Sequence, residues 1–113
     1  ILIVHPEIKK KINLFLKKNK KKRFVILDIP LMLENKIYKK NDILIFIESN
    51  KREILKRLKT RKNYNAKLYK NFKKIQLPLH QKKRKANYII KNNFLKKPVK
   101  VQVKNILKKL SNE

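Results

Sequence analysis

Residues 24–34 read FVILDIPLMLE, an apolar run that is interrupted by one aspartate and one proline. The stretch 24–29 is rich in β-branched residues and ends at Pro30, which is typical of a strand buried on both faces of a parallel sheet. Asp28 would then lie near the carboxyl end of that strand, where an acid can hold Mg²⁺ directly or through water. An ordinary strand end is the alternative interpretation. Glu34 follows in the next loop, where it could orient a substrate hydroxyl, hold metal-bound water or be a surface acid.

The apolar pattern on both sides of this run predicts further elements. A helix is expected from Pro6 to about Asn19, because apolar residues recur there at helical spacing. A second buried strand is expected over 43–47, and Ser49 or Asn50 could cap the helix after it. The remaining expected elements are helices over 51–62, 66–76 and 79–86, a strand over 88–90, and a last helix from about Pro98. Strands separated by helices indicate a parallel α/β sheet, and no internal boundary divides the chain into two domains.

The chain is strongly basic, and this charge leaves two interpretations open. It carries 34 Lys and Arg against 7 Asp and Glu, a formal net charge of +27. A basic nucleic-acid-binding protein of ribosomal type would use such a charge to contact phosphates. The charge is spread along the chain without a single stripe, however, and compositional drift toward Lys, Asn and Ile explains it equally well. A kinase for a phosphorylated substrate would also benefit from this field.

The absence of Gly, of Cys and of a long apolar stretch excludes several kinds of site. The chain has no Gly, so it contains neither the G-x-x-x-x-G-K-[ST] phosphate loop nor a G-x-G-x-x-G dinucleotide loop. It has no Cys, which excludes disulfides and thiolate metal sites. No apolar stretch approaches the roughly 20 residues of a membrane span, so we expect a cytoplasmic protein without membrane contact. The chain begins with Ile1, which indicates a processed start or a piece of a longer protein.

Two arginines are candidates for binding phosphate. Arg57 and Arg61 are four residues apart and would share a helix face. The planar guanidinium group grips phosphate oxygens in two-point contact, and the chain has only 5 Arg beside 29 Lys. A solvated helix face is the alternative. His5 would be a packing or capping residue, and the end of the third strand, near Asn93, could border a nucleotide base by analogy with other α/β folds.

The order of these features resembles the dephospho-CoA kinase family. The resemblance starts with His5-Pro6 before a basic amphipathic helix and with the segment LDIPLMLE at 27–34. It continues with Asp42 before a strand, the arginine pair in LKRLKTR at 55–61, Gln76, Ala86, IKN at 90–92 and Gln102-Val103. It covers residues from about 2 to 110. No single motif is decisive, but the ordered set is specific.

The resemblance implies transfer of the γ-phosphoryl group of ATP, with Mg²⁺, to the ribose 3′-hydroxyl of dephospho-CoA, the last step of coenzyme A biosynthesis. It implies a P-loop kinase-like fold, a three-layer parallel sheet with helices on both faces, whose N-terminal P-loop strand is missing. Residues 1–113 would form one partial domain, with a CoA-binding helical part over about 1–22 and core strands and lid over about 23–113. The implied roles are catalysis for Arg57 and Arg61, substrate binding for His5, Pro30, Leu31 and Glu34, nucleotide binding for Asn92 and Asn93, and metal binding for Asp28.

The chain departs from the family pattern at several positions. Ile54 replaces a common Gln, Asn87 and Lys91 each replace an Asp, and a Gly usual just after Asn92 is replaced in the 93–94 stretch. The phosphate loop and the acid that activates the 3′-hydroxyl would both lie upstream of residue 1, so this piece alone should not catalyse. A related nucleoside monophosphate kinase is a further alternative.

Overall fold

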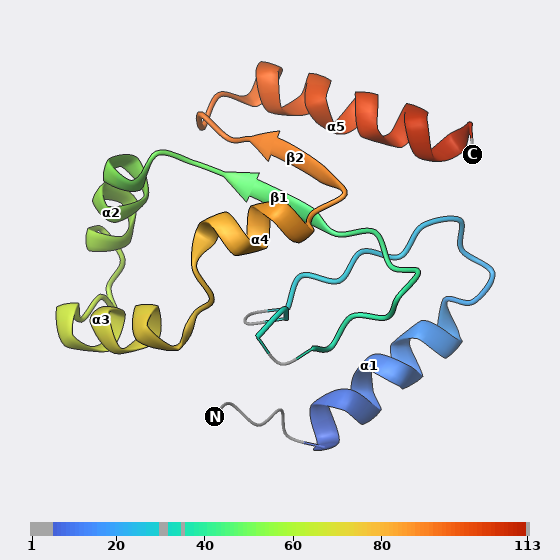
Figure 1. Ribbon diagram of the computed structural model, residues 1–113, viewed down its shortest axis with the longest axis horizontal. Coiled ribbons are helices and arrows are strands. Elements are labelled where there is room, and N and C mark those ends of the chain that lie inside the picture. Colours follow the sequence, from blue (N-terminus) through green and yellow to red (C-terminus); the bar gives the residue numbers. More distant parts are fainter. Residues whose placement is uncertain (1–5, 30–31, 35, 113) are drawn as a thin grey trace.

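The computed structural model of the 113-residue chain describes residues 6–29, 32–34 and 36–112. His5, Pro30 and Leu31, three of the predicted site residues, lie outside the described residues. The elements in chain order are α1 (Pro6–Lys18), β1 (Ile45–Glu48), α2 (Lys51–Lys59), α3 (Ala66–Ile75), α4 (Leu79–Lys85), β2 (Tyr88–Lys91) and α5 (Lys96–Ser111). All five predicted helices and two of the three predicted strands are therefore confirmed, with ends that shift by one to three residues (Figure 1).

Asparagine side chains begin two of the helices. The Asn50 Oδ1 atom accepts hydrogen bonds from the backbone N–H groups of Arg52 and Glu53, at 2.9 and 3.4 Å. Asn65 caps α3 in the same way, accepting from the N–H groups of Lys67 and Leu68. These bonds satisfy N–H groups that have no partner inside a helix. The predicted cap at Asn50 is confirmed.

The two strands pair in parallel, with Ile45 opposite Tyr88 and Glu48 opposite Lys91. The start of the pair is held by Asn87, whose Oδ1 atom accepts from the Leu44 N–H at 2.8 Å while its own N–H donates to the Leu44 carbonyl at 2.8 Å. Both strands point toward the side of the molecule where α2 lies (Figure 1). The carboxyl edge of the sheet therefore carries the start of α2 and the turn between β2 and α5.

The predicted buried strand over 24–29 is wrong for this structure. These residues form neither helix nor strand, and within the described residues they take part in no sheet ladder. Ile26 is 85% exposed. The apolar pattern predicts that this segment is buried. A strand also requires a neighbouring strand that pairs with its backbone N–H and C=O groups. No described strand lies beside it.

The buried core of the described residues is small and lies between β2 and α5. Ile90 is 7% exposed and Ile106 is 8% exposed, and no other described residue is buried to this extent. Elsewhere the apolar faces of the elements remain open to solvent. Large apolar side chains that are exposed include Ile8, Phe15, Phe24, Ile45, Ile47, Leu68, Phe72, Ile75, Val101 and Leu107. Exposed apolar surface on this scale is unusual in a monomeric domain.

A side-chain amide joins α5 to the edge of β2. The Gln102 Oε1 atom accepts from the Lys91 N–H at 2.7 Å, and its Nε2 atom donates to the Lys91 carbonyl at 2.8 Å. The same Nε2 atom also donates to the Pro98 carbonyl at 3.2 Å. The amide thus satisfies both backbone groups at the exposed edge of the last residue of β2, as a neighbouring strand would.

Replacing Gln102 by Leu is expected to lower the free energy of unfolding by about 2 kcal/mol, because two backbone hydrogen bonds worth about 1 kcal/mol each are lost. The amide proton of Lys91 should also lose its protection. Hydrogen exchange followed by NMR measures that proton directly. Unchanged protection of Lys91 in the variant would show that Gln102 does not hold this strand edge.

Candidate functional site

The carboxyl edge of the sheet brings together residues that are far apart in the sequence. The guanidinium carbon of Arg57, on α2, lies 3.9 Å from the centroid of the Phe94 ring, in the turn after β2. The Arg57 Nε atom lies 3.4 Å from Oε1 of Glu53, one helical turn earlier. Arg57 was predicted to bind phosphate, whereas no role was predicted for Phe94 or Glu53. The spacing of Glu53 and Arg57, four residues apart on a predicted helix, is the signal that could have indicated the ion pair.

The turn after β2 is held by its own asparagines. The Asn92 N–H donates to the Glu48 carbonyl at 2.8 Å, which continues the ladder between the strands. The Oδ1 atom of Asn92 accepts from the Phe94 N–H at 2.9 Å, and that of Asn93 accepts from the Leu95 N–H at 3.1 Å. Both amides thus shape the turn. Their predicted contact with a nucleotide stays a prediction.

Arg61 lies in the turn beyond α2 rather than on the helix. The helix ends at Lys59, and the Thr60 hydroxyl donates to the Arg57 carbonyl at 2.6 Å. The Arg61 N–H bonds to the Leu58 carbonyl at 3.1 Å, three residues back, which tightens the last turn. The helix is therefore shorter than predicted, and Arg57 and Arg61 do not share a regular helix face. No ion pair engages the Arg61 side chain within the described part of the chain.

Glu34 takes part in a nearly buried ion pair. Its Oε2 atom lies 2.7 Å from Nζ of Lys82 on α4 and accepts the Leu77 N–H at 2.9 Å. The Glu34 side chain is 4% exposed and that of Lys82 is 16% exposed. Among the described residues, the Glu34 Oε1 atom has no hydrogen-bond partner. Glu34 thus ties the loop after the 24–29 segment to the connection between α3 and α4, and beside it lies a hollow of about 250 Å³ lined partly by Leu33, Phe46 and Leu79.

Burial disfavours the charged form of Glu34, but the hydrogen bonds from Lys82 and Leu77 outweigh it, so the pKa of this carboxyl is lowered from its ordinary value. A lowered folded-state pKa stabilises the fold above the unfolded-state pKa, and this contribution is lost as the pH falls through the folded-state pKa. The difference in unfolding free energy between the unmodified protein and Glu34→Gln should therefore be largest at neutral pH and should shrink as the pH falls below the ordinary range of a Glu carboxyl. Urea unfolding at several pH values checks this. A difference that stays constant down to pH 3 would contradict it.

Asp28, the predicted metal ligand, is exposed to solvent. Across the described ranges, no group of three or more His, Cys, Asp or Glu side chains could enclose a metal ion. A single carboxylate still fits Mg²⁺, which takes most of its ligands from water and from substrate phosphates. No hydrogen bond or ion pair within the described residues joins Asp28 or Glu34 to the cluster around Arg57.

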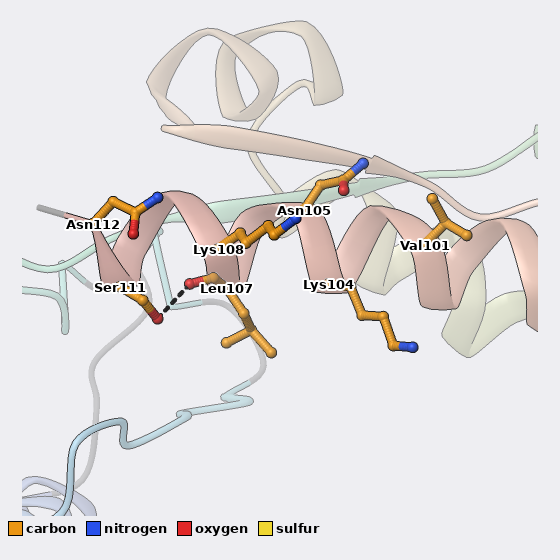
Figure 2. Close-up of a pocket in the computed structure, with 7 residues that line it drawn as sticks. All are labelled: Val101, Lys104, Asn105, Leu107, Lys108, Ser111 and Asn112. Atoms are coloured by element: carbon orange, nitrogen blue, oxygen red, sulfur yellow. Dashed lines mark hydrogen bonds between the residues drawn. The ribbon is translucent and has the colours of Figure 1, made fainter.

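A second hollow, of about 460 Å³, lies on the outer side of α5 and contains none of the predicted site residues. Figure 2 shows its lining, with Lys104 and Lys108 beside Val101 and Leu107, and with the Ser111 hydroxyl donating to the Leu107 carbonyl at 2.8 Å. All of these side chains come from one helix, so the hollow is a furrow on a helix surface. None of the helices in the described part of the chain combines the length and apolarity that a membrane span requires.

Comparison with known proteins identifies the family. The sequence model of a family described as dephospho-CoA kinase matches residues 2–97. A dephospho-CoA kinase of Wolbachia pipientis is 29% identical over 111 residues, which cover 96% of this chain and 56% of the relative. Those of Ehrlichia canis and Bacillus anthracis are 29% and 30% identical, covering 98% and 95% of this chain and 56% and 54% of their own lengths.

The chain thus spans about half the length of the curated relatives that it matches. No solved structure matches it significantly. The family match extends over most of the chain and includes β1, β2, both arginines and the turn after β2. The ordered motifs, the parallel strand pair and this match together establish that the chain belongs to the dephospho-CoA kinase family.

Proposed function

We propose that this chain forms the acceptor and lid half of a dephospho-CoA kinase. The whole protein would transfer the γ-phosphoryl group of ATP to the ribose 3′-hydroxyl of dephospho-CoA. The observation that carries this proposal is the position of Arg57, on the helix after β1 and against the turn after β2. The carboxyl edge of a parallel sheet is where α/β proteins bind nucleotides, and an arginine there can neutralise charge on a transferring phosphoryl group.

The phosphate loop is proposed to come from a segment outside this chain. The 113 residues include no Gly, so they cannot form such a loop. Two segments expose apolar side chains to solvent. In the segment 24–29, Ile26 is 85% exposed, and on β1, Ile45 and Ile47 are 45% and 59% exposed. A strand added beside β1 would cover these side chains and give a larger sheet of the three-layer P-loop kinase type.

The roles of individual residues follow from this arrangement. Arg57 and Arg61 would stabilise the transferring phosphoryl group, while Asp28 would hold Mg²⁺ together with the ATP phosphates and thereby neutralise their charge. The main chain near Asn92 would border the nucleotide. Glu34 would contribute to substrate binding, with its Oε2 atom held by Lys82 and by the Leu77 N–H.

The remaining site residues and the localisation are proposed from the family alone. His5, Pro30 and Leu31 would contribute to the acceptor site. Residues 1–22 would form a CoA-binding helical part, and residues 23–113 would form the core strands and the lid. A cytoplasmic location is proposed because both substrates are small and water-soluble.

The DNA upstream of the codon for Ile1 provides the first test. This DNA is expected to continue the open reading frame and to encode a strand, then G-x-x-x-x-G-K-[ST], then a helix. A protein expressed from the joined frame should use ATP and dephospho-CoA. Unrelated sequence or a stop codon directly before Ile1 would contradict the proposal.

A further inference from the structure

We infer that Phe94 is a positioning residue for Arg57, and that its ring sets the orientation of the guanidinium group at the phosphoryl-transfer site. This inference rests on the proposed function and deepens it, because it names a residue that controls the geometry of the catalytic arginine. Phe94 does not touch the reacting atoms. It acts through Arg57 alone.

The geometry is that of a cation lying on an aromatic ring. The Arg57 guanidinium carbon is 3.9 Å from the ring centroid, well inside the roughly 6 Å over which such contacts are attractive. Two other cation–ring contacts, Arg23 with Phe24 and Lys73 with Tyr69, are longer, at 5.5 and 5.4 Å. Those two also join residues close in sequence, whereas Arg57 and Phe94 come from separate elements.

Two contacts together restrict the guanidinium group. The ring of Phe94 covers one of its faces, and Glu53 engages its Nε atom at 3.4 Å. The terminal Nη groups have no partner among the described residues, and the Arg57 side chain is 55% exposed. The Nη groups are therefore the part of Arg57 that can meet phosphate oxygens in two-point contact. Without the ring, the long side chain would sample many rotamers at this exposed position.

The backbone of Phe94 is held in a costly conformation that places the ring. Its φ angle is +63°, in the left-handed region that is unfavourable for a residue other than glycine. The neighbouring turn enforces this angle, because Asn92 accepts the Phe94 N–H and Asn93 accepts the Leu95 N–H. Gln102 fixes Lys91 at the start of the turn. Strain that the surroundings over-determine is common at functional sites, and here it aims one side chain at Arg57.

The test uses the whole protein and compares Phe94→Leu with Phe94→Tyr. Leucine keeps the Cβ atom, the apolar character and the backbone strain, but removes the ring. Phe94→Leu should lower kcat about 2- to 5-fold, the effect of losing an exposed cation–ring contact, while KM for dephospho-CoA stays unchanged. Phe94→Tyr should restore kcat. Tyr69→Leu, which removes the ring at the longer Lys73 contact on α3, is the matched control and should leave kcat unchanged.

Two further measurements separate positioning from a general structural effect. In the Arg57→Ala background, Phe94→Leu should have no additional effect on kcat, because the ring acts only through Arg57. In NMR spectra, the Arg57 Nε–H proton should be shifted upfield by the ring, and Phe94→Leu should return it to the position of a free arginine.

Each outcome bears on one claim. An unshifted Arg57 Nε–H resonance, or an additive effect of Phe94→Leu in the Arg57→Ala background, would overturn the positioning role while the proposed function stands. Equal kcat for Phe94→Leu and the unmodified protein would also overturn it. An unmodified protein that makes no coenzyme A from dephospho-CoA and ATP would overturn the proposed function itself, and the inference with it.

Discussion

Replacing Arg61 by Ala is expected to lower kcat of the whole protein by about 10²-fold. The Arg61 side chain follows the last turn of α2 and is engaged in no ion pair within the described residues, so it is available for a phosphate. Loss of a positioned cation that meets charge developing in the transition state typically costs 10²–10³-fold in kcat. Steady-state kinetics with saturating ATP and dephospho-CoA measure this directly.

Lys62→Ala is the matched control for Arg61. Lys62 is exposed and adjacent in sequence, and it carries the same charge. If general positive charge near the lid were sufficient, the two substitutions would have similar small effects. Turnover of Arg61→Ala equal to that of Lys62→Ala would show that Arg61 is an ordinary solvated residue.

Replacing Glu34 by Ala is expected to lower the free energy of unfolding by about 3 kcal/mol. Removing one partner of a buried ion pair leaves the other charge uncompensated, which costs about 3–5 kcal/mol when burial is complete. The Lys82 side chain is 16% exposed, so part of that cost is relieved by water. The Leu77 N–H also loses its acceptor. Urea unfolding of the whole protein at pH 7 measures the change.

The ion pair of Glu48 and Lys83 is the natural comparison for Glu34. Its two side chains are 36% and 46% exposed, although the Nζ to Oε2 distance is only 2.5 Å. Exposed pairs contribute little to stability, because water solvates both charges when the pair is broken. Glu48→Ala should therefore destabilise the protein much less than Glu34→Ala. Equal effects would show that Glu34 is solvated in solution and does not tie the loop to α4.

Local chemistry made much of the fold predictable. The α5 helix follows from apolar spacing, and the cap of α2 follows from the ability of Asn to accept backbone N–H groups. The conformation of the 24–29 segment was not predictable in this way. Its sequence indicates burial, but whether it forms a strand depends on a partner strand, which a local pattern cannot reveal.

The site was predictable only in part, for a similar reason. Arg57 was predicted as a phosphate-binding residue because of its residue type and its place in the ordered set of motifs, but its position at the carboxyl edge of the sheet was not predicted. Its contact with Phe94 and the ion pair of Glu34 with Lys82 join residues distant in the sequence. Neither contact has a local signal, and both depend on how the elements pack. The helix end at Lys59, which moves Arg61 into a turn, depends on a cap by Thr60 that helix periodicity does not indicate.

The high positive charge left a nucleic-acid-binding protein open as an alternative. The family match over residues 2–97 instead places this chain in the dephospho-CoA kinase family. Its basic residues are consistent with binding a substrate that carries phosphate groups. Arg57 at the sheet edge, rather than the net charge, is the specific feature.

The acceptor specificity of the whole protein is the most direct test of this account. Purified protein would be supplied with ATP, Mg²⁺ and either dephospho-CoA or a series of nucleoside monophosphates, and the phosphorylated products would be quantified by chromatography. The account predicts coenzyme A as the main product, formed with a far higher kcat/KM than any nucleoside diphosphate. Preferential phosphorylation of a nucleoside monophosphate, with dephospho-CoA left unchanged, would contradict it.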